Sequence, residues 1–123
     1  MTRIAVVNDD TVFLAMMAAV LQEQKYDVKI WREADNAFEE LRSDLPDLII
    51  LDIRMETPES GWNLLEVLTL DRETRHVPVI VCSAAIRDLR SHEEWLNTHG
   101  IQVLPKPFDI EELYACVERS LRP

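Results

Sequence analysis

Short apolar runs alternate along the chain with longer segments in which apolar residues return about every three or four positions. Short runs predict buried strands, whereas a period near 3.6 predicts helices with one buried face. The five runs that predict strands are Arg3–Val7, Val28–Trp31, Leu48–Leu51, Val79–Cys82 and Gln102–Leu104. The segments after these runs predict five helices, so strand and helix are expected to alternate throughout.

Three of the expected helices carry boundary signals. Asp10 precedes the first helix and has the side chain that an N-cap position favours. Gly100 is expected to end the fourth helix. Asp109 and Glu112 open the last helix with the spacing of a capping box. The residues of the first helix that are expected to face the core are Phe13, Met16, Met17, Val20 and Leu21.

The regular alternation predicts the class of fold. Strands joined by helices pair in parallel through right-handed crossovers, and the helices cover both faces of the sheet. The unbroken apolar runs "LIIL" and "VIVC" are typical of strands covered on both faces. We predict an α/β fold with a doubly wound, five-stranded parallel sheet in the flavodoxin-like order 2-1-3-4-5. The length predicts one domain over residues 1–123 and no second domain.

The net charge and the length of the apolar segments exclude two classes of partner, nucleic acids and membranes. The formal net charge is −10, so direct binding to a nucleic-acid backbone is not expected. The longest apolar segment, "VFLAMMAAVL", is about half as long as a transmembrane helix, and no signal peptide is visible, so no membrane association is expected. Cys82 and Cys116 lack a CxxC spacing and are expected to be free, buried thiols in a reducing cytoplasm.

Polar residues follow four of the five expected strands. Asn8 and Asp9 follow the first strand, Asp52 the third and Ser83 the fourth, and Lys106 comes soon after the fifth. In a doubly wound sheet these strand ends meet at one edge, where ligands bind. A lone aspartate in such a place is more often a turn former or a helix cap. The convergence of several such residues on one edge favours a site instead.

The chemistry of these side chains favours phosphoryl transfer. Carboxylates at Asp9 and Asp52 would repel each other by roughly 4 kcal/mol at an effective dielectric constant near 20, unless a cation joined them. A hard divalent ion with oxygen ligands, Mg²⁺ or Mn²⁺, suits the pair. Such an ion brings phosphate oxygens with it, and Lys106 and Ser83 can bind others. Asp52 is then expected to be the nucleophile that forms an aspartyl phosphate.

Four segments resemble a known family. "VVNDD", "LIILDIRM", "VPVIVCSA" and "LPKPF" occur in the order and at the spacing of the response-regulator receiver domain of two-component signalling, like a single-domain chemotaxis regulator. The resemblance covers Arg3 to about Leu121. It implies a bacterial, cytoplasmic phosphoprotein of a phosphorelay that receives its phosphoryl group from a histidine kinase or a phosphotransfer protein. It implies no enzyme activity beyond promoting its own phosphorylation and dephosphorylation.

The resemblance also implies roles around the metal ion. Asp52 is the implied phosphoacceptor and a metal ligand. Asp9 and the backbone carbonyl of Arg54 are the other implied protein ligands, and Asn8 is implied to reach the ion through a water molecule. Asn8 stands where the family usually has an acid, so the loss of one negative charge predicts weaker Mg²⁺ affinity.

Further positions match the phosphoryl-binding and switch residues of the family. Ser83 matches a hydroxyl residue that moves toward the phosphoryl group, and Ala84 is small enough to let it approach. Lys106 matches a lysine that binds a phosphoryl oxygen, and its bond to Pro107 is implied to be cis. Val103 stands at a switch position that is often Tyr or Phe. Because it has no ring to rotate, any signal is expected to pass through the loop after Ser83 and the fifth strand.

Two surfaces are expected to meet partners. Leu14, Ala15 and Ala18 are expected to face outward from the first helix and to dock the phosphodonor, although the alanines have the alternative explanation that alanine favours helix. The resemblance also implies a downstream effector protein on the face formed by the fourth helix, the fifth strand and the fifth helix. A homodimer is an open alternative.

Two other functions stay open. One is a degenerate receiver that acts as a phosphate-independent interaction module, which Asn8 and Val103 favour and the intact acids, hydroxyl and lysine disfavour. The other is an α/β phosphatase with an aspartate nucleophile. It is less favoured, because such enzymes usually have a second aspartate where this chain has Arg54.

Overall fold

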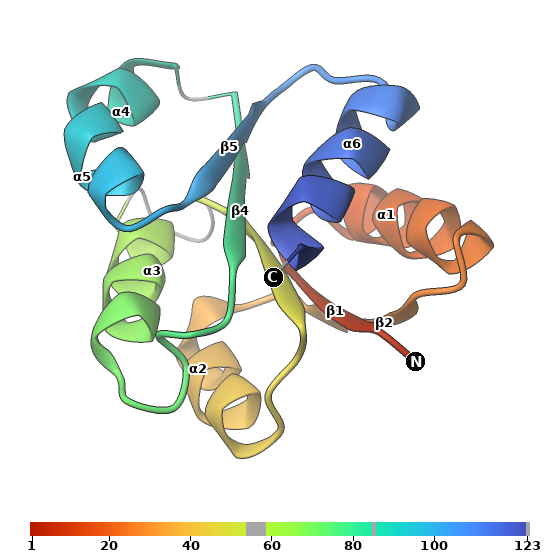
Figure 1. Cartoon of the computed structure of the whole chain (residues 1–123), viewed down its shortest axis with the longest axis horizontal. Coiled ribbons are helices and arrows are strands. Elements are labelled where there is room, and N and C mark those ends of the chain that lie inside the picture. The colour runs from red at the N-terminus through yellow and green to blue at the C-terminus, as the bar shows by residue number, and fades with distance from the viewer. Residues whose placement is uncertain (54–58, 85, 123) are drawn as a thin grey trace.

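A parallel sheet of five strands forms the centre of the molecule, with helices on both of its faces (Figure 1). The computed structural model describes residues 1–53, 59–84 and 86–122. The strands are β1 (Arg3–Val7), β2 (Asp27–Trp31), β3 (Leu48–Asp52), β4 (Val79–Ser83) and β5 (Gln102–Pro105). They pair in parallel in the order β2-β1-β3-β4-β5. The predicted fold and strand order are confirmed.

In the described part of the chain six helices cover the sheet, one more than predicted. They are α1 (Thr11–Glu23), α2 (Ala34–Ser43), α3 (Ser60–Leu70), α4 (Ile86–Ser91), α5 (Glu93–Thr98) and α6 (Ile110–Leu121). The single helix predicted between β4 and β5 is divided at His92, so the predicted fifth helix is α6. The His92 ring stacks on Trp62 of α3, with 3.8 Å between the ring centroids. Gly100, with a φ of 66°, follows α5 as predicted. Within the described residues, no helix combines the length and apolarity that crossing a bilayer requires.

Two apolar layers form the core, one on each face of the sheet. α1 and α6 pack on one face, against strand residues that include Ile4 and Ile50. α2, α3 and the α4–α5 pair pack on the other face, against residues that include Ile49 and Val81 (Figure 1). β3 and β4 are buried along their whole length. Coverage on both faces therefore explains the unbroken apolar runs in the sequence.

Helix α1 follows the predicted core stripe except at Leu14 and at Met16, which is predicted to face the core but is 40% exposed. Leu14, Met17 and Leu21 are fully buried against the sheet. The prediction that Leu14 faces outward is wrong, whereas Ala15 is exposed and Ala18 is half-buried. The helix is apolar almost all round, so the pattern alone does not fix which stripe turns toward the core.

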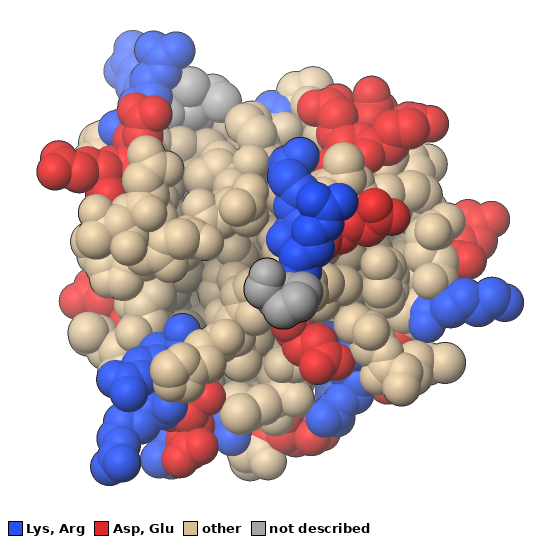
Figure 2. Space-filling view, viewed as in Figure 1, with Lys and Arg blue, Asp and Glu red and all other residues tan. Residues whose placement is uncertain are grey.

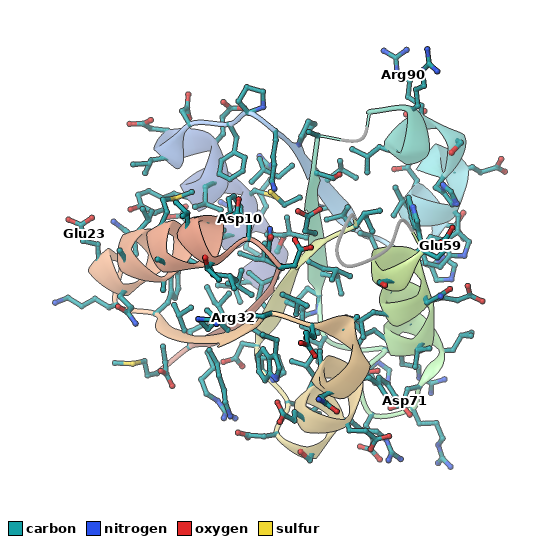
Figure 3. The ribbon with its side chains drawn as sticks, turned by 180° about the vertical axis from the view of Figure 1, so that it is seen from behind. Asp10, Glu23, Arg32, Glu59, Asp71 and Arg90 are labelled. Atoms are coloured by element: carbon teal, nitrogen blue, oxygen red, sulfur yellow. The ribbon has the colours of Figure 1, made fainter. Side chains whose placement is uncertain are left out.

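The predicted caps of α1 and α6 are confirmed. Asp10, at the start of α1 (Figure 3), accepts hydrogen bonds from the backbone N–H groups of Val12 and Phe13 at 3.0 and 3.2 Å. Asp109 accepts from the backbone of Glu112 at 2.8 Å, and the Glu112 carboxylate accepts from the backbone of Asp109 at 3.2 Å. These caps satisfy N–H groups that a helix leaves unpaired at its start.

Candidate functional site

The carboxyl ends of three strands bring buried polar residues to one edge of the sheet. Asn8 follows β1, Asp52 ends β3 and Ser83 ends β4. Only 1%, 8% and 1% of their respective surfaces are exposed. β3 lies between β1 and β4, so the carboxylate has the central position. Buried polar groups need partners, and the contacts of Asp52 therefore show how this edge is organised.

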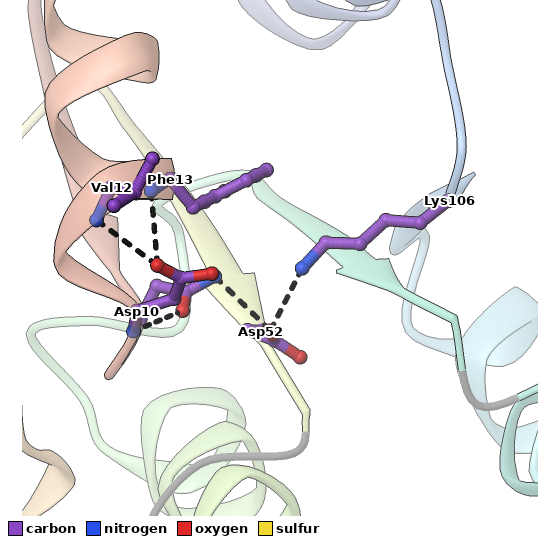
Figure 4. A network of polar contacts seen from close by, with 6 residues as sticks. Asp10, Val12, Phe13, Asp52 and Lys106 are labelled. Atoms are coloured by element: carbon purple, nitrogen blue, oxygen red, sulfur yellow. Dashed lines mark hydrogen bonds and ion pairs between the residues drawn. The ribbon is translucent and has the colours of Figure 1, made fainter.

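Two donors converge on one oxygen of Asp52. The Nζ atom of Lys106 lies 3.0 Å from Oδ2, and the amide Nδ2 of Asn8 donates to the same oxygen at 3.0 Å (Figure 4). The side chains of Lys106 and Asp52 are 24% and 9% exposed. A charge withdrawn from water is tolerated when an opposite charge and hydrogen-bond donors face it. The structure thus brings Asp52 and Lys106 together, as the sequence predicts.

Aromatic rings and backbone bonds position Lys106. Its Nζ atom lies 4.2 Å from the centre of the Phe13 ring, a cation–π distance, and Phe13 meets Phe108 edge-on with centroids 6.3 Å apart. The Lys106 backbone N–H donates to the Ser83 carbonyl at 3.0 Å, and the Lys106–Pro107 bond is cis, as the resemblance implies. The sequence predicts Phe13 only as a core residue and does not predict its contact with Lys106. The only signal is an aromatic residue in the first turn of α1.

Asn8 makes contacts that the sequence does not predict. Besides donating to Asp52, its side chain accepts a hydrogen bond through Oδ1 from the backbone N–H of Asp10 at 2.8 Å. The expected role of Asn8, reaching a metal ion through water, stays a prediction. The sequence shows only that an amide stands beside the carboxylates, and not where its two ends point.

Asp9 and Asp52 are the two side chains that the sequence predicts as ligands of a cation. Asp9 is exposed and adjoins Asn8. In the part of the chain that the structure describes, no three or more His, Cys, Asp or Glu side chains gather as a metal-binding group. Mg²⁺ is usually held by one or two carboxylates together with water, so the oxygen donors of this pair fit it. The backbone carbonyl of Arg54, the other predicted ligand, lies outside the described residues.

Of the remaining predicted site residues, Ala84 adjoins Ser83, whereas Val103 and Leu14 belong to the apolar layers. Ala84, next to the buried Ser83, is exposed. Val103 lies inside β5, where it pairs with Val81, and it is half-buried against the apolar layer on the α3 side of the sheet. Leu14 belongs to the opposite apolar layer and takes no part in the site.

Cys82 is the neighbour of Asp52 across the sheet and is not a competing nucleophile. The register pairs Asp52 with Cys82. Burial raises the pKa of the Cys82 thiol to about 12, against the opposing effect of the Lys106 ammonium. The thiol is therefore neutral near pH 7. Cys82 and Cys116 are both free and buried, as predicted.

Comparison with known proteins identifies the family. The response regulator receiver domain matches residues 4–118. The chain therefore belongs to the receiver domain family of two-component response regulators.

Relatives and solved structures agree with this membership. The response regulator ArlR of Staphylococcus saprophyticus is 30% identical over 122 residues, which cover 99% of this chain and 53% of ArlR. The chemotaxis response regulator CheY4 of Vibrio cholerae has the same fold, with a TM-score of 0.85 and 21% identity over 98% of this chain and 99% of CheY4. The receiver domain of the sensor histidine kinase PA1611 from Pseudomonas aeruginosa, solved with a magnesium ion coordinated in its active site cleft, has a TM-score of 0.82 and 24% identity over 98% of this chain and 97% of that one. The chain spans about a quarter to a half of the length of the curated relatives that it matches, from 24% to 53%.

Proposed function

We propose that this chain accepts a phosphoryl group on Asp52 from a histidine kinase or a phosphotransfer protein, in a Mg²⁺-dependent reaction in the cytoplasm, and that the modification switches its binding to a partner. The observation that carries the proposal is the 3.0 Å contact between Lys106 Nζ and Asp52 Oδ2 in a site with little exposure to water. That pair places a nucleophilic carboxylate beside a cation that can bind the incoming phosphoryl oxygens.

The chemistry is an in-line displacement at phosphorus. A carboxylate oxygen of Asp52 forms a bond to phosphorus while the bond from phosphorus to the donor nitrogen breaks, and the leaving imidazole takes a proton from water. Lys106 neutralises charge on a phosphoryl oxygen, and the Ser83 hydroxyl at the end of β4 moves to donate to another, with the small Ala84 leaving room for it. The protein contributes alignment and charge neutralisation, because this kind of transition state needs little covalent assistance.

A divalent ion completes the site. Asp9, Asp52 and the backbone carbonyl of Arg54 would hold Mg²⁺ or Mn²⁺, and Asn8 would approach it through water. When bound, the ion offsets the charge of the carboxylates and of the phosphoryl oxygens. The magnesium reported in the receiver domain of PA1611 supports this assignment.

The exposed stripe of α1 is the proposed docking surface for the phosphodonor. Val12 is 77% exposed and Met16 is 40% exposed, and Ala15, one position before Met16, is also exposed. The half-buried Ala18 borders the same stripe, whereas Leu14 has no part in it. An apolar stripe in solvent, directly after the cap at Asp10, suits the apolar face of a helix from the donor.

The α4–α5 pair, β5 and α6 form the proposed face for the effector protein. A groove of about 640 Å³ between the α4–α5 pair and β5 is lined by Leu89, Leu96, Ile101 and Val103, among other residues. Homodimerisation is the alternative use of this face. Nucleic acid is not proposed as a direct ligand, since Figure 2 shows basic side chains interspersed with acidic ones on one face of a chain of net charge −10.

Asn8 and Val103 favour a second candidate, a degenerate receiver that binds partners without phosphorylation. Incubation with a small phosphodonor and Mg²⁺, followed by intact mass measurement, separates the two functions. One phosphoryl adduct that is absent from Asp52→Asn supports the proposed function, and no adduct supports the degenerate receiver. Continuous turnover of phosphate esters would contradict both and indicate a phosphatase.

A further inference from the structure

The side chain of Asn8 is buried and bonded at both ends. Its amide nitrogen donates to Asp52 Oδ2 at 3.0 Å, and its carbonyl oxygen accepts from the Asp10 backbone N–H at 2.8 Å. A carboxylate only accepts and a backbone N–H only donates, so the two ends of the amide cannot be exchanged. An aspartate at position 8 would keep the bond to Asp10 but would face Asp52 with a second acceptor.

Asn8 therefore connects the central carboxylate to the start of α1. Asp10, whose N–H it binds, caps α1 through Val12 and Phe13. Asp52 Oδ2 receives Lys106 and Asn8 together, so one cation and one amide donor face this buried carboxylate. Between two acids, a bridging cation would hold the carboxylate in place and offset its charge. Here Asn8 holds the carboxylate and Lys106 offsets its charge.

We propose that Asn8 is a positioning residue that holds the Asp52 carboxylate against the N-terminus of α1 without a divalent ion, and so makes the folded site less dependent on Mg²⁺. The inference deepens the proposed function, since Asp52 is the proposed phosphoacceptor. The positioning of Asp52 by Asn8 is nevertheless a property of the unmodified protein.

Thermal unfolding with and without Mg²⁺ tests this role in the wild type, Asn8→Asp and the double variant Asn8→Asp/Asp52→Asn. Without metal, Asn8→Asp is expected to lower Tm by roughly 5 °C, because a hydrogen bond to a charged group is replaced by repulsion between two acids. Mg²⁺ is expected to raise the Tm of Asn8→Asp by more than that of the wild type. The double variant leaves one carboxylate instead of two at this contact, so the repulsion between acids is removed and part of the lost Tm is expected to return.

A matched control separates this contact from general charge repulsion. Asn63→Asp adds the same charge at an exposed position of α3 and is expected to leave both Tm and its response to Mg²⁺ unchanged. The inference is overturned if Asn8→Asp melts at or above the wild-type temperature without metal, if both gain equally from Mg²⁺, or if the double variant is no more stable than Asn8→Asp. Should Asn8→Asp not fold without metal, recovery of folding in the double variant supports the inference and its failure overturns it.

The melting series needs no phosphodonor, so it fails or succeeds independently of the proposed function. If the Tm changes are as expected but the wild type gains no phosphoryl adduct, Asn8 is a positioning residue and Asp52 is not a phosphoacceptor. If Asp52 gains the adduct but none of the expected Tm changes is seen, Asp52 is the phosphoacceptor and Asn8 is not a positioning residue.

Discussion

Lys106 Nζ lies 3.0 Å from Asp52 Oδ2, although 54 positions separate the two residues in the sequence. The ion pair exists because β3 and the end of β5 reach the same edge of the sheet, with β4 between them. Replacing Lys106 by Met keeps much of the apolar stem and removes the charge, which leaves the buried carboxylate with fewer partners. We expect Lys106→Met to lower the free energy of unfolding by about 1–3 kcal/mol in urea denaturation.

The same substitution in the background of Asp52→Asn provides the control. The amide of the background variant carries no charge that needs a cation, so Lys106→Met should cost clearly less there. Equal costs in both backgrounds would show that Lys106 stabilises the fold through its contact with Phe13 rather than through Asp52.

Gly61 is predicted to be irreplaceable because of its neighbour Ile53. A Cβ atom on Gly61 would collide with the backbone carbonyl of Ile53, the residue directly after Asp52. Gly61→Ala should therefore cost on the order of 3 kcal/mol of stability and slow phosphorylation of Asp52, since backbone rather than a flexible side chain must move. Urea denaturation and the mass assay measure the two effects.

Gly100→Ala is the matched comparison. Gly100 has a φ of 66°, but a Cβ atom added to it would meet no described atom within 4 Å beyond its chain neighbours, so only backbone strain of about 1 kcal/mol is expected. A similar loss for both variants would argue that close packing on Ile53 is not what requires Gly61.

The fold was predictable because strands that are buried on both faces of a sheet consist almost entirely of apolar residues. "LIIL" and "VIVC" can only be strands buried on both sides or segments of buried helix, and their alternation with helical periods favours the former. The position of Asp52, Ser83 and Lys106 at one edge follows directly from parallel pairing. Parallel pairing therefore predicts which residues share this edge, whereas their chemical roles stay predictions.

Side-chain orientation and local breaks were not predictable in the same way. The apolar pattern of α1 surrounds the helix and does not fix which residues face the core, and Leu14, which is predicted in solvent, is fully buried. The division between α4 and α5 falls at His92, whose ring stacks on Trp62, and neither residue has a periodic signature in the sequence. Likewise, the bond from Asn8 to Asp52 depends on the rotamers of two side chains from different strands.

The corrected orientation of α1 changes which variant tests phosphodonor docking. Leu14→Ala should cost roughly 2–5 kcal/mol of stability, because it empties a site in the core. Ala15→Lys should alter stability by less than about 0.5 kcal/mol, because Ala15 is exposed. If the exposed stripe docks the donor, Ala15→Lys slows transfer from a phosphorylated histidine domain but leaves phosphorylation by a small phosphodonor unchanged. Slowing of both reactions would place the effect at Asp52 instead.

Asp71 is expected to make stability depend on pH in the acid range. Partial burial opposes its ionisation, but the N–H groups of Glu73 and Thr74 and the Arg42 guanidinium outweigh this and lower the pKa of Asp71. A lowered folded pKa contributes stability that is present above the unfolded value, near 3.9, and that is lost as the pH falls through the folded value.

Asp71→Asn removes this contribution at a place remote from the candidate site, beyond the end of α3 (Figure 3). Urea unfolding should show a stability difference between the wild type and Asp71→Asn that is largest near pH 6 and shrinks as the pH falls below about 3.9. A difference that stayed constant from pH 6 to pH 3 would mean that packing, and not the ionised carboxylate, accounts for the loss.

The Cys82 thiol is predicted to be unreactive toward alkylating reagents until the protein unfolds. Its side chain is buried, and its pKa is raised to about 12, whereas an unfolded cysteine ionises near pH 8.5. The folded state therefore keeps a proton that the unfolded state releases, so stability should fall as the pH rises above about 8.5. At pH 8, alkylation of Cys82, followed by peptide mass analysis, should be slow and should accelerate with urea in proportion to the unfolded fraction. Rapid alkylation that did not respond to urea would mean that the reagent reaches Cys82 in the folded protein. The conclusion that this thiol is buried and neutral would then be wrong.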